Sequence, residues 1–472
     1  MLKNHIIKIL NNHLGFVPTD SQQVLIDKLS DFFLKPDNAG LFLIKGYAGT
    51  GKTTMISAMV KTFRELHIKS VLMAPTGRAA KVMTSYSGEA AYTIHKKIYK
   101  QRSSKDGFGD FVPDRNLHGS TFFIVDEASM ISNTSPDASM FGSGHLLDDL
   151  LGYVYNGRNC RLIIVGDTAQ LPPVKLDISP ALDKEVLKSY GYEVQEVVLT
   201  DIVRQSTGSG ILMNATTIRN QIAERDEKLP HLEVEQYPDI IKIGGDELIE
   251  ALTSSHDKYG ITQNIVVCRS NKRANIFNQG IRNQILWQES EIAAGDLLMV
   301  VKNNYFWAGT TEEIDFIANG DIVEIKRIVK YPYELFGMRF ADVVVRFIDY
   351  TKELEMEVKI MLDTLTVNTA SLPSEKNKEL FYAVLEDYQH LKTRKAQYEG
   401  VRKDPFFNAL QVKFAYAVTC HKAQGGQWKS VFVDQGYLTD DMVNVEYLRW
   451  LYTAFTRATE ELYLVNFKKE FF

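Results

Sequence analysis

The sequence predicts an α/β protein with two parallel-sheet domains and a small β-rich insertion in the second of them. Short apolar runs alternate with longer helical patterns over the first two-thirds of the chain, which is typical of parallel α/β sheets. A second set of such runs appears towards the C-terminus. The interval before it carries short strand patterns separated by turn signals.

The apolar runs are four or five residues long and rich in Ile, Val and Phe, the composition of strands that are buried on both faces. The first set lies at residues 41–44, 70–74, 121–125 and 161–165. The second set lies at residues 264–268, 430–434 and 461–465. Two such sets, separated by a long interval, predict two α/β domains.

The β-rich interval spans about residues 294–367, with turn signals at residues 318–321 and 336–337. Residues 374–403 then follow a helical pattern, with Leu380, Val384, Tyr388 and Leu391 on one face. We therefore expect an all-β unit with a helical appendage. Residues 107–111, between two polar stretches, predict a loop or hairpin that projects from the first domain.

The composition is that of a soluble globular protein: 45% of the 472 residues are hydrophobic and 24% are charged. No apolar run approaches the roughly 20 residues that span a bilayer, and the N-terminus predicts an amphipathic helix rather than a signal peptide. We expect a cytoplasmic protein with no membrane partner. Cys160, Cys268 and Cys420 lack metal-ligand spacing and fit buried thiols in a reducing compartment. The net charge of −5 does not exclude nucleic acid, because a local positive groove can bind phosphates.

A phosphate-binding loop follows the first predicted strand. Residues 46–53 read Gly-Tyr-Ala-Gly-Thr-Gly-Lys-Thr, which is the P-loop pattern. Its glycines let backbone N–H groups curl around phosphates, and the helix N-terminus adds partial positive charge. We expect Lys52 to reach the β- and γ-phosphates and the Thr53 hydroxyl to bind Mg²⁺. The candidate nucleotide-binding residues here are Gly46, Ala48, Gly49, Thr50, Gly51, Lys52, Thr53 and Thr54.

An acidic pair, Asp126 and Glu127, follows the predicted strand at residues 121–125. The carboxyl ends of strands are where α/β sheets bind ligands. Beside a P-loop, the pair predicts that Asp126 holds Mg²⁺ through water and that Glu127 polarises the attacking water. The chain lacks the Asn-Lys-x-Asp sequence that reads guanine, and we expect ATP as the nucleotide.

A polar loop at residues 166–174, Gly-Asp-Thr-Ala-Gln-Leu-Pro-Pro-Val, follows the next strand and can place Gln170 against the γ-phosphate. This loop resembles motif III of superfamily 1 helicases. Further segments resemble the other motifs of that superfamily in order. They are residues 19–22 (Q motif), 74–80 (Ia), 93–96 (Ib), 199–205 (IV), 418–425 (V) and 451–458 (VI). Their form resembles the RecD-like and Dda-like enzymes of superfamily 1B.

The resemblance implies two RecA-like P-loop motor domains, with a pin insertion in the first and an SH3-like β-domain before motif V. Motor domain 1 would comprise residues 1–94 and 119–205, interrupted by a pin-like insertion at residues 95–118. Motor domain 2 would comprise residues 206–290 and 411–472. The SH3-like insertion and its helical appendage would span residues 291–410.

The resemblance also implies the roles of further residues. Gln22 would read adenine. Arg204 and Arg457 would stabilise the charge that develops on the γ-phosphoryl oxygens, completing a catalytic set with Lys52, Glu127 and Gln170. The residues in motifs that contact single-stranded DNA in the family are Thr76, Arg78, His95, Thr419 and His421. Relatives place a strand-separating pin within residues 95–118, where Phe108 or Phe111 is the candidate wedge; a flexible basic loop is the alternative.

The function implied is that of an ATP-dependent DNA helicase. It would move 5′-to-3′ on single-stranded DNA and unwind duplex at junctions, in repair, recombination or replication. We expect a monomer, with a single-strand-binding protein as a candidate partner. Two alternatives are a nucleic-acid-stimulated ATPase that clamps or remodels complexes without unwinding, and the motor subunit of a helicase–nuclease complex.

Overall fold

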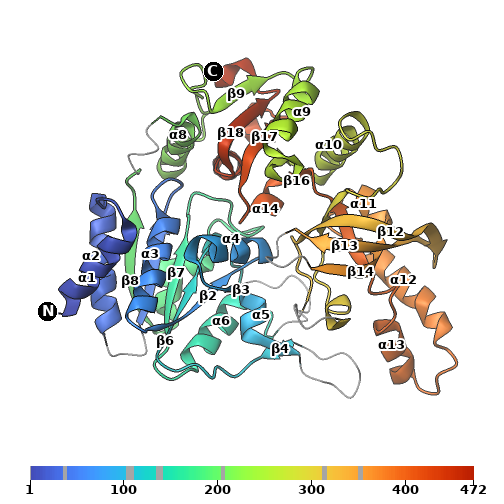
Figure 1. Ribbon diagram of the computed structural model, residues 1–472, viewed down its shortest axis with the longest axis horizontal. Coiled ribbons are helices and arrows are strands. Elements are labelled where there is room, and N and C mark those ends of the chain that lie inside the picture. The colour runs from blue at the N-terminus through green and yellow to red at the C-terminus, as the bar shows by residue number, and fades with distance from the viewer. Residues whose placement is uncertain are drawn as a thin grey trace.

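The computed structural model describes residues 2–35, 40–101, 111–133, 142–202, 208–310, 316–348 and 354–472, and every structural statement below concerns these residues. They form two parallel sheets flanked by helices, a closed β-barrel and a helical pair beside the barrel (Figure 1). The predicted α/β class with parallel sheets is confirmed. Within these ranges, no helix is long and apolar enough to cross a membrane.

The first domain is a parallel sheet in the order β3-β2-β6-β7-β1-β8. Its strands are β1 (Gly40–Gly46), β2 (Lys69–Ala74), β3 (Ala91–Thr93), β6 (Thr121–Val125), β7 (Arg161–Gly166) and β8 (Glu193–Leu199). Its helices are α1 (Leu2–Leu14), α2 (Asp20–Leu34), α3 (Lys52–Glu65), α4 (Gly77–Ser87), α5 (Ile94–Ile98), α6 (Leu146–Tyr155) and α7 (Lys184–Ser189). Helices α1 to α3 share one apolar core with the sheet, and α5 to α7 share another. The sheet is thus buried on both faces, as its apolar strands require.

The second domain is a parallel sheet in the order β16-β10-β17-β18-β9. Its strands are β9 (Ile240–Ile243), β10 (Asn264–Cys268), β16 (Ala417–Thr419), β17 (Trp428–Asp434) and β18 (Ala458–Val465). Its helices are α8 (Gly210–Glu224), α9 (Leu248–Tyr259), α10 (Asn271–Gln284), α14 (Cys420–Ala423) and α15 (Val445–Phe455). Helix α15 packs against α8 and ends at the edge that faces the first domain.

A closed barrel interrupts the second domain between α10 and β16. Its strands are β11 (Leu297–Val300), β12 (Ile322–Leu335), β13 (Met338–Phe347), β14 (Glu355–Met361) and β15 (Leu410–Phe414). The predicted turn at Phe336 and Gly337 joins β12 to β13, and both residues have positive φ, 54° and 67°. Such a two-residue turn matches the twist of a hairpin. Strands β11 to β14 lie in the interval at residues 294–367 that the strand and turn patterns predicted, whereas β15 lies beyond it.

The helical appendage differs from its prediction. Residues 374–403 form two helices, α12 (Ser374–Asp387) and α13 (Arg394–Arg402), after a short α11 (Asp363–Thr366). The Thr393 side chain accepts a hydrogen bond from Ala396 N and starts α13 as a new helix. Leu380 and Val384 are buried, but Tyr388 and Leu391 lie between the helices. The expectation of one continuous helical face was wrong for these two residues.

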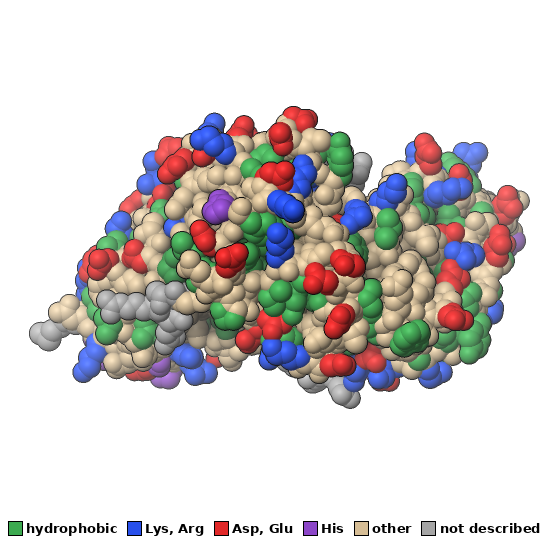
Figure 2. Space-filling view, turned by 90° about the horizontal axis from the view of Figure 1, so that it is seen from above, with side chains coloured by type: hydrophobic (Ala, Val, Ile, Leu, Met, Phe, Trp, Pro, Cys, Tyr) green, Lys and Arg blue, Asp and Glu red, His purple; other side chains and the backbone are tan. Residues whose placement is uncertain are grey.

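The barrel, α12 and α13 form a separate lobe. Seen from above, a notch divides this lobe from the larger body, and Lys and Arg side chains lie beside it (Figure 2). Two short strands of the first domain, β4 (Tyr99–Gln101) and β5 (Phe111–Pro113), pair antiparallel. The loop or hairpin predicted at residues 107–111 begins before β5, and residues 102–110 lie outside the described residues.

Candidate active site and nucleic-acid interface

The phosphate loop leaves the carboxyl end of β1 and enters α3. Gly49 and Gly51 have φ of 74° and 83°, a region that L side chains rarely occupy, and Gly51 is the residue before the helix. The Lys52 ammonium donates to Tyr47 O at 2.8 Å. Thr53 and Thr54 are exposed in the first turn of α3. The loop thus has the shape and the open helix N-terminus that a phosphate site needs.

The acidic pair lies at the carboxyl end of β6. Asp126 accepts hydrogen bonds from the Tyr86 hydroxyl at 2.7 Å and from Glu127 N at 2.8 Å. Glu127 has φ of 53° and ψ of 36°, a left-handed conformation that is uncommon for its type. Burial raises the pKa of both carboxyls; the charge of Arg457 counters this for Glu127. A raised pKa suits a group that must accept a proton near neutral pH.

Motif III adds two polar side chains at the end of β7, next to β1 in the sheet. Asp167 is buried, and its Oδ2 lies 3.7 Å from the Lys52 ammonium. Gln170 is 5% exposed, and within the described chain its Oε1 has no hydrogen-bond partner. Strands β6, β7 and β1 thus bring the acidic pair, Asp167 and the phosphate loop to one edge of the sheet.

Helix α15 of the second domain docks directly on this edge. The Thr453 hydroxyl accepts from Leu171 N at 2.8 Å, and Arg449 donates to the carbonyls of Thr168 and Gln170. The Tyr452 hydroxyl, 1% exposed as a residue, accepts from Ala48 N at 2.8 Å and donates to Asp167 Oδ2 at 2.7 Å. From this helix and the turn after it, the sequence predicts a role only for Arg457, which follows the C-cap residue Thr456. The spacing of residues 449, 452 and 453 places them on one face of α15, and this pattern is the signal that points to them.

Arg457 lies one turn after Thr453 and is 3% exposed. Its guanidinium donates to Thr453 O at 3.1 Å and to Gly426 O at 3.2 Å, so the second domain holds it in place. The electrostatic effect of its charge on Glu127 places it near the acidic pair, across the junction of the two domains. Arg204, the other predicted arginine, lies outside the described residues.

Gln22 is completely buried under the phosphate loop. Its Oε1 accepts from Thr19 N at 3.1 Å, and its Nε2 donates to Thr50 O at 3.0 Å. Thr19 accepts in return from Gln22 N, which makes a capping box at the start of α2. The Gln22 amide therefore holds the phosphate loop in place through its hydrogen bond to the Thr50 carbonyl.

Motif Ia lies against the second domain and the barrel. The Thr76 hydroxyl caps α4 by accepting from Ala79 N at 3.2 Å. The Arg78 guanidinium lies 3.9 Å from the centre of the Trp428 ring. Lys81 donates to Ile348 O in the barrel lobe at 2.9 Å. Helix α4 therefore contacts three parts of the molecule at once.

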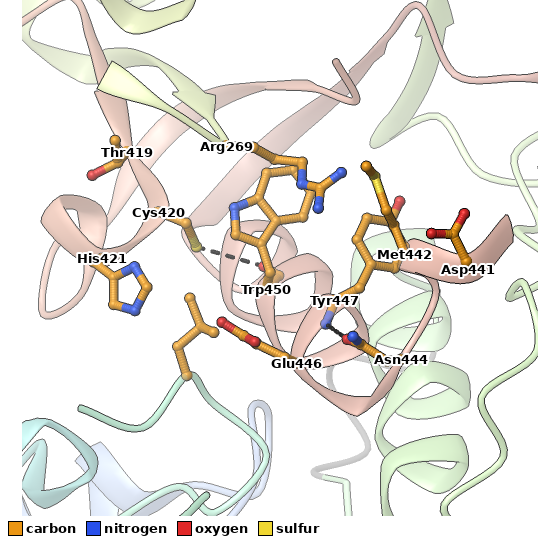
Figure 3. Close-up of a pocket in the computed structure, with 11 residues that line it drawn as sticks. Arg269, Thr419, Cys420, His421, Asp441, Met442, Asn444, Glu446, Tyr447 and Trp450 are labelled. Carbon is orange, nitrogen blue, oxygen red and sulfur yellow. Dashed lines mark hydrogen bonds between the residues drawn. The ribbon is translucent and has the colours of Figure 1, made fainter. Parts of the chain in front are cut away.

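Thr419 and His421 line a cavity of about 340 Å³, into which Leu171 of motif III also projects. Figure 3 shows Thr419, Cys420 and His421 on one side, with Arg269 and Trp450 across from them. Asp441, Asn444 and Glu446 also line it. The cavity joins residues of both domains at the predicted nucleic-acid interface.

His95 belongs to the short helix α5 of the first domain. Its ring centre is 5.8 Å from that of Tyr99, and burial lowers its pKa to about 4. The imidazole is therefore neutral at physiological pH and can offer hydrogen bonds or stacking, but no charge.

The two candidate wedge residues of the predicted pin are Phe108 and Phe111. Phe108 lies outside the described residues. The Phe111 ring packs on Tyr305 of the inserted segment, with ring centres 4.3 Å apart, and Tyr305 packs on Phe316 at 5.1 Å. This stack ties the β4–β5 hairpin to the barrel lobe.

Comparison with known proteins finds two matching families and several helicases that are similar to this chain. A family described as "AAA domain" matches residues 34–235, and a "UvrD-like helicase C-terminal domain" matches residues 414–465.

The ATP-dependent RecD2 DNA helicase of Deinococcus radiodurans is 26% identical over 56% of this chain and 34% of its own length, so the chain spans about a third of that relative. The ATP-dependent DNA helicase dda of Enterobacteria phage T4 is 23% identical over 89% of this chain and 93% of its own. The structure of Pif1 helicase from Bacteroides with ADP-AlF3 and single-stranded DNA covers 96% of this chain and 93% of its own, at 14% identity and a TM-score of 0.46.

Proposed function

We propose, from the premise that this chain belongs to superfamily 1B of the DNA helicases and hydrolyses ATP, that it moves 5′-to-3′ along single-stranded DNA and unwinds duplex. The premise follows from the matched families and from the helicase relatives. The direction of movement and the separation of strands are the parts that we infer. They rest on the order and form of the motifs.

One observation carries the proposal: the phosphate site lies where two parallel-sheet domains meet. The Ala48 amide, the Asp167 carboxylate and the Leu171 amide of the first domain each bond to α15 of the second. A simple hydrolase needs only the first domain. A site shared between two domains allows the state of the nucleotide to change their relative position, which is what translocation requires.

The chemical roles follow from the positions of the side chains. Lys52 and the loop amides bind the phosphates of ATP, and Glu127 accepts the proton of the attacking water. Gln170 orients that water or the γ-phosphate through its free amide oxygen, and Arg457, together with Arg204, stabilises the transferring phosphoryl group. Gln22 contributes to adenine binding from beneath the loop.

The donor set also fits Mg²⁺. Thr53 offers an exposed hydroxyl and Asp126 a carboxylate, both hard oxygen ligands of the kind that Mg²⁺ prefers. The described chain holds no cluster of three or more metal-binding side chains. This suits an ion that takes its remaining ligands from phosphates and water. Bound there, Mg²⁺ would neutralise charge on the β- and γ-phosphates.

The strand track runs along the other side of the domain junction in this proposal. Thr419 and His421 line the cavity on the second domain, while Thr76, Arg78 and His95 belong to the first. The hydroxyl and imidazole groups among them bind a backbone without reading its sequence, whereas the Arg78 guanidinium stacks on Trp428. The partners are single-stranded DNA and duplex junctions, with a single-strand-binding protein as a further partner of the monomer.

We assign the barrel lobe to the SH3-like insertion (residues 291–410) and the β4–β5 hairpin to the pin (residues 95–118). Motor domain 1 then comprises residues 1–94 and 119–205, and motor domain 2 comprises residues 206–290 and 411–472. Contact of Phe111 with Tyr305 supports a pin that is braced by the lobe.

Two measurements test the proposal. ATP hydrolysis should rise on adding an oligothymidylate, and a duplex with a 5′ single-stranded tail should be unwound faster than one with a 3′ tail. Stimulated hydrolysis without unwinding of either substrate would instead indicate an ATPase that clamps or remodels. Preference for the 3′-tailed duplex would overturn the direction.

A further inference from the structure

Tyr452 of the second domain makes a direct hydrogen bond to the phosphate loop. Its hydroxyl lies between two groups of the first domain, accepting from Ala48 N at 2.8 Å and donating to Asp167 Oδ2 at 2.7 Å. The residue is 1% exposed, so both hydrogen bonds are made out of contact with water. Buried hydrogen bonds to a charged group are stronger and more directional than exposed ones.

The position of this hydroxyl is fixed from both sides. One residue further along α15, the Thr453 hydroxyl accepts from Leu171 N, and one turn earlier Arg449 bonds to the carbonyls of Thr168 and Gln170. On the phosphate loop itself, the guanidinium of Arg219 in α8 lies 4.4 Å from the centre of the Tyr47 ring. Tyr452 is therefore held at a defined point of the loop.

The Asp167 bond extends the link to the lysine of the loop. Asp167 Oδ2, which accepts from Tyr452, also lies 3.7 Å from the Lys52 ammonium. One hydroxyl thus connects α15 both to a loop amide and, through Asp167, to Lys52. The same helix leads into Arg457, five residues on.

We propose that Tyr452 is a positioning residue that sets the phosphate loop and Lys52 in their catalytic arrangement only when the two motor domains are together. The inference rests on the proposed function, because it makes hydrolysis depend on the domain arrangement that DNA promotes. When the domains separate, Ala48 N and Asp167 lose this common partner, and the loop is free to adopt other shapes. Hydrolysis is thereby restricted to the closed state.

The test compares Tyr452→Phe with Tyr463→Phe. The first variant keeps the ring and removes the bridging hydroxyl. The control removes a tyrosine hydroxyl of the same domain that bonds only locally, to Glu461 at 3.0 Å, and leaves the stack on Phe432. The kcat and KM of ATP hydrolysis are measured with and without oligothymidylate. Affinity for a fluorescent ATP analogue and the melting temperature are measured alongside.

With saturating oligothymidylate, Tyr452→Phe should lower kcat about tenfold or more, the effect of losing one positioned hydrogen bond at a reacting centre. The KM for ATP and the analogue affinity should change less than about twofold, and the control should match the unaltered protein. An unchanged kcat, or a change in KM alone, overturns the inference.

A double-mutant cycle separates this inference from a general loss of structure. If Tyr452 acts through Asp167, then Tyr452→Phe should have little further effect on kcat in an Asp167→Asn background. Additive losses would overturn the part of the inference that links Tyr452 to Lys52 through Asp167. If oligothymidylate fails to stimulate the unaltered protein, the proposed function fails; the effect of Tyr452→Phe on basal kcat then still decides the role of Tyr452.

Discussion

Arg78 of motif Ia stacks on Trp428 of the second domain, with 3.9 Å between the guanidinium carbon and the ring centre. The sequence suggested that Arg78 contacts the DNA strand, whereas the structure gives it a contact between domains. The two roles are distinguishable, because a phosphate contact contributes to the salt dependence of DNA binding and a stack between domains does not.

We expect Arg78→Ala to reduce DNA-stimulated hydrolysis about five- to thirtyfold, since a half-buried cation–π contact contributes about 1–2 kcal/mol to the association of the two domains. The slope of log affinity for oligothymidylate against log salt should stay the same. Arg78→Lys keeps the charge but lacks the planar stacking group and should resemble the alanine variant. A slope reduced by about one would return Arg78 to the phosphate contacts.

Glu127→Gln should bind ATP and fail to hydrolyse it, while Lys52→Ala should abolish turnover by removing the charge that faces the phosphates. Fluorescent-nucleotide titration and phosphate release measure the two steps separately. Near-normal turnover by Glu127→Gln would contradict its assignment as general base.

The raised pKa of Glu127 also predicts the pH profile of the unaltered enzyme. Because burial favours the protonated carboxyl, the acid limb of kcat/KM should lie above the ordinary range of a glutamate. Activity should therefore fall on mild acidification, as the base takes up its proton.

Arg457→Ala should lower kcat by about 10³-fold or more, as arginine fingers do in other nucleotide hydrolases, and Arg204→Ala should act in the same direction. Nucleotide affinity should change far less than turnover. Arg457 also donates hydrogen bonds to the carbonyls of Thr453 and Gly426. The melting temperature of the Arg457→Ala variant must therefore be compared with that of the Arg457→Lys variant. A loss confined to KM would indicate ground-state binding instead.

Phe111 and Tyr305 should behave as a unit. If their stack braces the hairpin, Phe111→Ala and Tyr305→Ala should both impair duplex unwinding while DNA-stimulated hydrolysis survives. If Phe111 is itself the wedge, only its own variant should impair unwinding. Phe108→Ala supplies the third arm, because Phe108 is the other predicted wedge. Normal unwinding by both phenylalanine variants would move the pin elsewhere.

His95 should make the fold sensitive to mild acid. Its pKa is lowered from 6.5 to about 4 by burial, so below pH 6.5 the unfolded chain binds a proton that the folded protein does not. The contribution of the neutral ring to the free energy of unfolding is complete above pH 6.5 and is lost as the pH falls from 6.5 to about 4. Urea unfolding at neutral pH and at about pH 5 should show a loss of order 1–2 kcal/mol that is absent in His95→Gln.

The strands buried on both faces could be predicted from the sequence almost to the residue. The runs at residues 121–125 and 264–268 coincide with β6 and β10. Edge strands were missed: β8 carries Glu193, Gln195 and Glu196 among its apolar residues, because one side of an edge strand is solvated. Strand β15 was missed because it follows the helical appendage and returns to the barrel.

The site was predictable where local sequence determines the chemistry. The phosphate loop and the acidic pair follow strands directly and lie as expected. Tyr452 and the Arg78–Trp428 stack depend on how two distant segments meet, and a single sequence does not show that. Gln22 had a local signal that the interpretation passed over, since Thr19 and Gln22 have the spacing of a capping box.

The ends of the barrel lobe lie side by side. Strand β11, where the chain enters, pairs antiparallel with β15, where it leaves, in the register Leu298 to Phe414. Because the two ends of the insertion are adjacent, the length of the inserted segment does not affect the geometry of the sheet that it interrupts. Insertions and deletions between β11 and β15 would change the size of the lobe while the flanking α10 and β16 kept their positions. The chain between β11 and β15 can therefore vary in length without moving the points at which it joins the second domain, while the apolar core that the barrel shares with that domain limits how far its strands can change.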